Sequence, residues 1–176
     1  MEPSPLFTTD RLAVREFTAA DLDDFARLCA DPVAMRWMGD GQPLSRASVE
    51  QWIGVCRERY ASRGYGTSAV FERESGGFAG FCGVVRAAGN DFDEIIYAFE
   101  QRCWGRGYAA EAGRAMLEYV FARSGLDRIY ATIHPDNRAS IAVAGKLGMR
   151  FERQEIEDDG VPVGFYVIER PAPAKR

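Results

Sequence analysis

Two glycines and two arginines lie within residues 101–112, which read QRCWGRGYAAEA. The stretch comes between a strand-like apolar run and an amphipathic helical pattern. A chain that turns through Gly105 and Gly107 into a helix leaves main-chain N–H groups without partners, and the helix dipole favours an anion beside them. Glycine also lets a phosphate come close to the main chain. Because Arg102 and Arg106 add positive charge, the stretch predicts a site for a pyrophosphate group.

The same glycines allow two other interpretations. A tight strand-to-helix turn without any ligand has a similar sequence. Gly105, Gly107 and Ala110 also fit the G-x-G-x-x-A pattern of dinucleotide-binding proteins, with Asp127 near the offset of their ribose-binding acid. That acid should close the second strand, whereas Asp127 would open one, and too little chain follows for a doubly wound sheet. We therefore do not expect a dinucleotide here.

Other side chains with typical catalytic or metal-binding chemistry are few. The four cysteines, Cys29, Cys56, Cys82 and Cys103, have no C-x-x-C spacing, and His134 is the only histidine, so we expect no metal site. Buried, reduced thiols are the simplest interpretation. Cys103 could act as a nucleophile because arginines lie beside it, yet it has no base nearby in the sequence.

Length and charge limit the class of protein. The chain of 176 residues is long enough for one core and short for two, so we expect a single domain over 1–176, with its core in 9–170 and a loose tail at 171–176. The net charge of −4 argues against nucleic acid and fits an amine substrate better. No apolar run reaches the roughly 20 residues of a membrane span, and the N-terminus does not resemble a signal peptide. We expect a cytoplasmic protein that binds neither nucleic acid nor membranes.

Periodicity predicts the elements that position the glycine-containing stretch. Strand patterns cover residues 12–17, 67–72, 78–86, 94–100, 127–133, 149–155 and 163–169. Helical patterns follow the capping pair of Thr18 and Asp21, cover 45–61 and 108–124, and fill a short segment between 134 and 148. The strands between 67 and 100 should form an antiparallel meander with turns at 74–77 and 89–91. The crossover from strand 94–100 through helix 108–124 to strand 127–133 predicts a parallel pair.

In this order the motifs resemble the GNAT N-acetyltransferases, and among them the RimJ/RimL-like group, which includes enzymes acting on protein N-termini. The resemblance runs from about residue 9 to residue 169. Its matching segments are R-x-x-G-x-G-Y-A at 102–109, N-x-x-S at 137–140, K-L-G-M at 146–149, T-x-R-L-x-V-R at 9–15 and D-P-V at 31–33.

The resemblance implies an α/β fold of the α+β type: a mixed, mostly antiparallel sheet of about six or seven strands, flanked by about four helices. Two parallel strands would splay apart to admit the pantetheine arm of acetyl-CoA. Main chain near Phe99 would pair with pantetheine and help to polarise the thioester carbonyl, where an oxyanion develops. The implied contacts of acetyl-CoA are Phe99, Arg102, Trp104, Gly105, Arg106, Gly107, Tyr108, Ala109, Asn137 and Ser140. The amine would attack directly in a ternary complex, so neither a metal nor an acyl-enzyme is implied.

The residue that would protonate the thiolate leaving group differs from the family pattern. Many relatives have a tyrosine seven residues after the asparagine, where this chain has Ala144. Ser140 is the candidate that remains at the same helix start. Ser140 could equally be a packing or capping hydroxyl, and Asn137 is an expected N-cap that the resemblance also places on pantetheine or a water.

The amine must lose a proton before or during attack, which requires a base. Glu94 and Glu100 flank the strand that enters the glycine turn, and we choose Glu94, with Ser140 and Asn137, as the predicted catalytic residues. His134 is another candidate because its ordinary pKa is near neutrality. The simpler interpretation of each glutamate is a solvated charge on the surface. The simpler interpretation of His134 is a residue that only ends a strand.

Residues 33–41 give the only indication of the acceptor. Met35, Trp37 and Met38 crowd together near Asp40. Such apolar bulk usually packs in a core, but the resemblance makes this segment one wall of the acceptor pocket. Trp37 and Met38 are therefore our predicted acceptor contacts. An apolar wall with an acid at its rim suits a peptide N-terminus better than a sugar amine.

The sequence thus predicts an acetyl-CoA-dependent N-acetyltransferase that is a monomer or homodimer. Its acceptor would be a primary amine, from a protein N-terminus or a small molecule. Two alternatives remain open: a non-catalytic acetyl-CoA-binding sensor or assembly module, and a site for another nucleotide.

Overall fold

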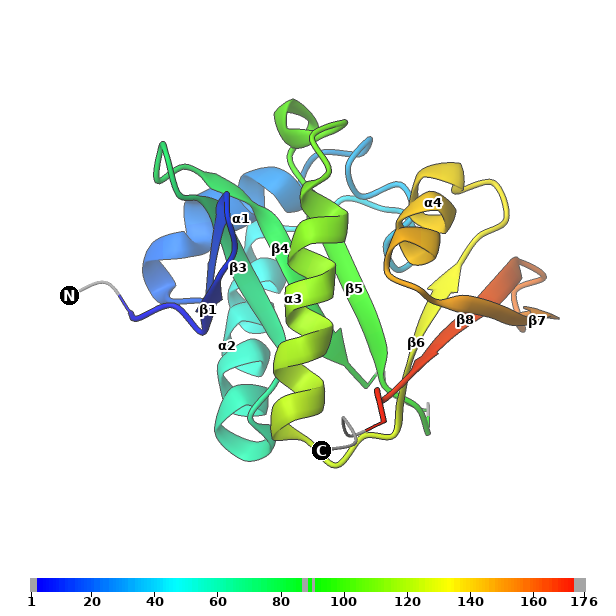
Figure 1. Ribbon diagram of the computed structural model, residues 1–176. Helices are drawn as coiled ribbons and strands as arrows, with labels where there is room; N and C mark the ends of the chain where they lie inside the picture. Colours follow the sequence, from blue (N-terminus) through cyan, green and yellow to red (C-terminus); the bar gives the residue numbers. More distant parts are fainter. Residues whose placement is uncertain (1–2, 87–88, 90, 173–176) are drawn as a thin grey trace.

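The computed structural model describes residues 3–86, 89 and 91–172 (Figure 1). These residues form an eight-stranded sheet in the order β1-β2-β3-β4-β5-β6-β8-β7. The strands are β1 (Phe7–Thr8), β2 (Leu12–Arg15), β3 (Thr67–Glu72), β4 (Phe78–Val85), β5 (Glu94–Phe99), β6 (Arg128–Ile133), β7 (Arg150–Ile156) and β8 (Pro162–Glu169). The helices are α1 (Leu22–Cys29), α2 (Arg46–Arg63), α3 (Tyr108–Arg123) and α4 (Arg138–Lys146), with 3-10 turns η1 (Ala19–Asp21) and η2 (Gln101–Cys103).

The α+β fold with a mixed, mostly antiparallel sheet is confirmed. All seven expected strands and all four expected helices are present, and β1 is an additional strand. β1 has only two residues, which is too short for an alternating pattern to be recognised. The expected strand 12–17 ends at Arg15, because the Asp21 carboxylate accepts a hydrogen bond from the Thr18 N–H at 2.7 Å and turns the chain. Asn90 of the expected turn and residues 173–176 of the expected tail lie outside the described residues.

Helices cover both faces of the sheet. α3 and α4 pack on one face, and α1 and α2 pack on the other (Figure 1). Side chains of β5 alternate between them: Ile95 and Phe99 join the core under α3, whereas Ala98 joins the core under α1 and α2. The central strand β4 is buried along its whole length, as expected for a strand covered on both sides.

The two parallel strands touch at one point only. β5 and β6 share the single register pair Glu94–Tyr130, where the Tyr130 N–H donates to the Asp93 carbonyl at 2.9 Å. Beyond this pair the strands diverge toward the end of β5 that leads into η2 (Figure 1). Every other pair of neighbouring strands is antiparallel, so the sheet is not the doubly wound sheet of a dinucleotide-binding protein.

The divergence leaves main-chain groups of β5 facing an open edge. Successive residues of a strand direct their N–H and C=O groups to opposite neighbours. The Asp93 carbonyl faces β6, so the main-chain groups of Tyr97 and Phe99 face the same side. The Glu100 N–H faces β4 instead, where it donates to the Ala79 carbonyl at 2.9 Å. The second half of β5 therefore presents Tyr97 and Phe99 to the gap between the strands.

Helix α3 is fixed at its end by an arginine from the C-terminal part of the chain. The guanidinium of Arg170 donates to the carbonyls of Phe121, Ser124 and Leu126, the last two at 2.7 Å. The first two are carbonyls that the helix end leaves without intrahelical partners, and Leu126 lies in the segment that follows the helix. On the inner face, a side chain at Gly113 would approach Leu147 of the α4 end to 3.2 Å, so α3 and α4 lie close together. The helix is therefore held in place while its first turn stays open.

Candidate active site

The glycine loop, residues 101–107, joins β5 to α3 with two residues of positive φ. Gly105 has φ +72° and Gly107 has φ +81°. Side chains strongly disfavour this left-handed region, so the turn itself requires glycine at both positions. Gly107 is also the N-cap residue of α3, a position from which a serine or asparagine would normally satisfy a helix N–H.

The start of α3 has unpaired main-chain donors as a result. Its first intrahelical bond runs from the Glu111 N–H to the Gly107 carbonyl, at 3.1 Å. The N–H groups of residues 108–110 precede that bond, and no side chain of the described residues caps them from the N-cap position. In contrast, Ser45 caps α2 by accepting from the Ser48 N–H at 3.1 Å. The donors of α3, with the helix dipole behind them, can hold an anion.

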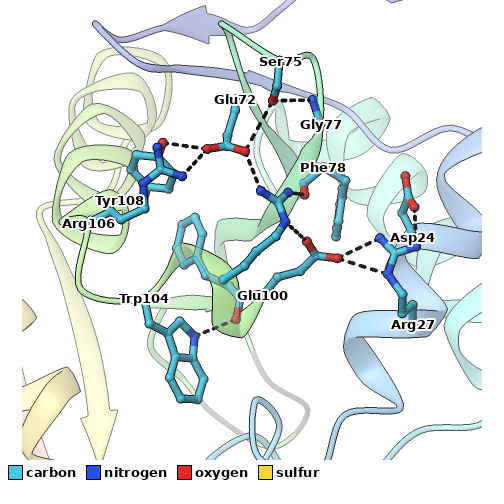
Figure 2. A network of polar contacts seen from close by, with 12 residues as sticks. Asp24, Arg27, Glu72, Ser75, Gly77, Phe78, Glu100, Trp104, Arg106 and Tyr108 are labelled. Carbon is cyan, nitrogen blue, oxygen red and sulfur yellow. Dashed lines mark hydrogen bonds and ion pairs between the residues drawn. The ribbon is translucent and has the colours of Figure 1, made fainter.

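Beside the loop, a buried carboxylate joins three of the predicted site residues (Figure 2). Glu72, the last residue of β3, accepts from Arg102 Nη1 at 2.6 Å, from Arg106 Nη1 at 2.5 Å and from the Tyr108 hydroxyl at 2.8 Å. Only 8% of Glu72 is exposed. Its hydrogen bonds from Arg102, Tyr108 and Arg106 lower the pKa of the carboxyl to about 2. Glu72 is therefore ionised at any physiological pH.

The two arginines differ in how much of each guanidinium is engaged. Arg102 uses Nη1 on Glu72, Nε on Glu100 at 2.7 Å and Nη2 on the Phe78 carbonyl. Arg106 bonds Glu72 through Nη1 and stacks over the Tyr108 ring, 4.6 Å from its centroid. Both arginines lie at the loop as predicted, but Arg102 is held by two carboxylates and a carbonyl.

Glu100, one of the predicted base candidates, belongs to the same network. It accepts from Arg27 Nη2 at 2.7 Å, and Arg27 also pairs with Asp24 at 2.8 Å (Figure 2). The Glu100 side chain is 14% exposed. Solvated surface charge is therefore the wrong interpretation of Glu100, which ties α1 to the glycine loop.

Trp104 reaches back to the end of β5. Its indole N–H donates to the Phe99 carbonyl at 2.8 Å, while about half of the residue, 48%, stays exposed. The indole therefore occupies the carbonyl of Phe99 that faces the gap. The N–H of Phe99 faces the same side, which leaves it as the main-chain donor at this end of the strand.

Across the gap, the start of α4 confirms one expected role. Asn137 is the N-cap of α4, where its Oδ1 accepts from the Ser140 N–H at 3.2 Å. The Ser140 hydroxyl is not the cap of this helix, and the residue is half-buried. Ala144, at the position of the missing tyrosine, is buried in the core at 2% exposure.

Tyr97 is a candidate site residue that the sequence reasoning missed. Its side chain is partly buried and packs against the core of the α3 and α4 face. Burial raises the pKa of Tyr97 to about 12, and the nearby Ser140 hydroxyl opposes part of that rise. A phenol is therefore delivered toward Ser140 from β5 instead of from α4. A hydroxyl inside an otherwise apolar strand pattern was the signal available in the sequence.

Glu94 lies where β5 and β6 meet, on the α1 and α2 face. Its carboxylate accepts from the Thr132 hydroxyl at 2.5 Å. Burial raises its pKa, and Glu157 acts in the same direction. Glu94 lies at the end of β5 away from the glycine loop. Its side chain is on the face of the sheet opposite that of Tyr97.

Trp37 and His134 stack on each other beside the end of β6. Their ring centroids are 4.9 Å apart with an interplanar angle of 27°. The His134 Nδ1 accepts from the Asp136 N–H at 3.1 Å, which assigns the proton of the neutral ring to Nε2. Trp37 is 41% exposed, whereas Met35 is buried in the core at 1% and Met38 packs against that core. The interpretation that these apolar residues pack in a core is therefore confirmed for Met35 and wrong for Trp37.

The other sequence candidates for reactive groups are buried. All four cysteines are free thiols with little exposure, and burial raises the pKa of Cys103 despite its neighbour Arg102. A Cys103 thiolate is therefore not available as a nucleophile.

Over residues 3–86, 89 and 91–172, no group of three or more potential metal ligands comes together. No helix within the same residues is long and apolar enough to span a membrane.

The splayed strand pair and the open helix start lie together at the carboxyl end of the parallel strands, an arrangement that suits a phosphate-bearing ligand. Residues 11–150 match the family described as "Acetyltransferase (GNAT) domain". The chain belongs to this GNAT family, and its class of activity is that of an acetyl-CoA-dependent N-acetyltransferase.

Known proteins support the assignment. The chain is 31% identical to "Uncharacterized N-acetyltransferase YnaD" of Bacillus subtilis, over 82% of each chain. Its structure resembles RimL, a ribosomal L7/L12 alpha-N-protein acetyltransferase in complex with coenzyme A, with TM-score 0.81, 16% identity and coverage of 94% and 98%. It also resembles spermidine N-acetyltransferase from Vibrio cholerae in complex with CoA and spermine, with TM-score 0.76, 15% identity and coverage of 92% and 97%. At these identities the two structures show the shared fold.

The glycine loop gives a first prediction. We expect Gly107→Val to abolish measurable acetyl-CoA binding, because valine strongly disfavours φ +81° and the turn that directs the N–H groups of α3 would change. Isothermal titration calorimetry measures the affinity. Gly64→Val is the matched control, since Gly64 has φ +77° at the end of α2 with no atom near its missing Cβ. Unchanged affinity in Gly107→Val would mean that the loop is only a turn.

The buried carboxylate gives a second prediction, on stability. The folded-state pKa of Glu72, about 2, lies below the unfolded value of about 4.3. Its ion pairs therefore stabilise the fold above about pH 5 and lose that contribution as the pH falls toward 2. The difference in thermal midpoint between the wild type and Glu72→Gln should shrink over this range, measured by circular dichroism. A difference independent of pH would contradict an ionised Glu72.

Proposed function

We propose that this protein transfers the acetyl group of acetyl-CoA directly to a primary amine in a ternary complex. The observation that carries the proposal is the open start of α3, placed beside the unpaired edge of β5. Helix N–H groups suit a pyrophosphate, and a strand edge suits the amide groups of pantetheine. RimL and spermidine N-acetyltransferase, two acetyltransferases of the same fold, are both in complex with coenzyme A.

The donor would lie along β5, with its phosphates at the glycine loop. Residues 108–110 would hold the pyrophosphate through their N–H groups, supported by Arg106. The N–H of Phe99 would stabilise the charge that develops on the thioester oxygen, because a fixed donor at that oxygen lowers the barrier to attack. The thioester would then lie between the two faces of the sheet.

Glu94 is our proposed base. Its raised pKa favours uptake of a proton from the amine, and it lies on the α1 and α2 face. Glu157 adds a second negative charge in its vicinity, which favours a cationic amine. As the C–N bond forms, the amine proton would reach Glu94 through a water relay, because Glu94 and Phe99 lie about 16 Å apart along β5.

Ser140 and Tyr97 are our proposed donors to the departing thiolate. They lie on the opposite face from Glu94, so proton uptake and proton donation would occur on different sides of the thioester. The raised pKa of Tyr97 keeps its phenol protonated at neutral pH. When the C–S bond breaks, Ser140 would pass a proton to sulfur and recover one from Tyr97.

For the acceptor, we propose an amine with an apolar neighbour, such as a peptide N-terminus. The stack of Trp37 on His134 places an exposed aromatic surface at the end of β6. RimL and spermidine N-acetyltransferase show that the fold serves both a protein N-terminus and a polyamine. The apolar wall favours the first of these for this chain.

Release of free CoA thiol, measured with a panel of peptides, polyamines and aminoglycosides, tests the proposed function. We expect turnover with at least one amine, and with peptides above sugar amines. Acetyl-CoA binding without turnover on any acceptor would instead support a non-catalytic acetyl-CoA-binding module.

The proton donors give a third prediction. Ser140→Ala should lower kcat by roughly 10 to 10⁴-fold with little change in acetyl-CoA affinity, as expected for loss of a general acid. Tyr97→Phe should also lower kcat. Tyr119→Phe, which removes a hydroxyl from the distant part of α3, is the control and should not. Unchanged kcat in Ser140→Ala would assign Ser140 to packing.

The acceptor wall gives a fourth prediction. Trp37→Ala should raise the KM for the acceptor and leave the acetyl-CoA affinity near normal, because the half-exposed ring faces away from the core. Val33→Ala, at an exposed position of the same loop, is the control. Steady-state kinetics with both substrates varied measures the two constants. A lower thermal midpoint with an unchanged acceptor KM would show that Trp37 only stabilises the fold.

A further inference from the structure

We propose that Glu72 is a positioning residue for the cofactor phosphates: it fixes the glycine loop and presents Arg106 to them. This inference rests on the proposed function, since it concerns the same acetyl-CoA site. Glu72 lies on β3, which contributes no main chain to the glycine loop and is separated from the parallel strand pair by β4. No motif in the sequence connects it to the loop.

The contacts of Glu72 span the loop. Arg102 lies before Gly105, and Arg106 and Tyr108 follow it, yet all three donate to the same carboxylate. One buried group therefore fixes the distance between the two ends of the turn. Within the loop, the 3-10 turn η2 has main-chain bonds of its own, from the Cys103 N–H to the Glu100 carbonyl at 2.8 Å and from the Trp104 N–H to the Gln101 carbonyl at 3.1 Å. The contacts of Glu72 hold the glycine-containing half that follows, and so fix the direction of its N–H groups.

A second contact holds the opposite side of the loop. Arg11 donates through Nη1 to the Arg106 carbonyl at 2.8 Å, and its Nε donates to Glu111 of the first turn of α3 at 2.7 Å. Two contacts therefore fix Arg106: its main-chain carbonyl accepts from Arg11, and its own Nη1 donates to Glu72. The Arg106 side chain is 46% exposed and that of Arg102 is 48% exposed, so the two arginines differ in the number of bonded nitrogens and not in exposure.

The division of labour between the arginines follows from their contacts. Each nitrogen of Arg102 bonds Glu72, Glu100 or Phe78, so Arg102 acts as an anchor. Arg106 has one nitrogen on Glu72 and is free to offer its Nε and Nη2 to a phosphate in the planar geometry that a guanidinium favours. Glu100 and the Phe78 carbonyl thus make Arg102 the anchor, whereas Glu72 holds Arg106 through one nitrogen and leaves the other two for the ligand.

Simple charge repulsion predicts the opposite role for Glu72. A carboxylate close to a polyanionic ligand should weaken binding, and its removal should strengthen binding. Positioning predicts that removal weakens binding, because the loop and Arg106 lose their fixed geometry. The two effects differ in sign, so a single affinity measurement separates them.

The experiment compares Glu72→Gln with Glu74→Gln by calorimetric titration with acetyl-CoA at pH 7.5. Glu74 is exposed in the turn after β3, so its variant makes the same change of charge without touching the loop. We expect about tenfold weaker binding for Glu72→Gln, as for loss of one partner of a buried ion pair, and less than about twofold change for the control. Tyr108→Phe, which removes one of the three donors, should give a smaller loss. Equal or tighter binding by Glu72→Gln would overturn the proposal.

A donor without phosphates distinguishes positioning from general damage to the fold. S-acetylpantetheine lacks the nucleotide and pyrophosphate, so its kcat/KM should be the same in wild type and Glu72→Gln. An equal loss with both donors would overturn the proposal, because Glu72 would then act on the whole site.

In an Arg106→Gln background the effect of Glu72→Gln on acetyl-CoA affinity should shrink, and full additivity of the two effects would also overturn the proposal. If the wild type does not bind acetyl-CoA, the proposed function fails as well; if it binds without turnover, the calorimetric arm still tests Glu72.

Discussion

The single contact between β5 and β6 is the constraint on which the site depends. The two parallel strands join at Glu94 and Tyr130 and then separate, whereas every other pair of neighbouring strands shares at least two register pairs. A pair of strands that separates must leave main-chain donors and acceptors without sheet partners. In this fold those groups face the end of the sheet where α3 begins, so the strand edge and the helix start lie together.

The alternation of side chains along β5 then separates two kinds of chemistry. Residues of one parity, including Tyr97, face α3 and α4, and residues of the other parity, including Glu94, face α1 and α2. A donor lying along the strand edge would therefore have a hydroxyl pair on one face and a carboxylate on the other. The direct transfer that we propose needs these opposite proton movements, which Glu94 and Tyr97 of β5 would supply together with Ser140 of α4.

Charge around the glycine loop is balanced before any ligand binds. Glu72 and Glu100 neutralise much of Arg102 and Arg106, and Glu111 pairs with Arg11 at 2.5 Å. Attraction for phosphate therefore depends less on net charge than on fixed dipoles: the unpaired N–H groups of α3 and the remaining donors of Arg106. This agrees with a protein whose net charge of −4 would otherwise repel an anionic cofactor.

The sequence by itself determined what a few neighbouring residues encode: the periodicity of seven strands and four helices, the glycine turn at Gly105 and Gly107, and the cap at Asn137. The tertiary structure alone decided which distant side chains meet. Glu72 binds Arg106 across 34 residues of chain, and Arg11 binds Glu111 across 100. The reason is physical: helix, strand and turn preferences act through local φ/ψ angles and spacing, whereas an ion pair between remote elements exists only after packing of the sheet and helices has placed both partners.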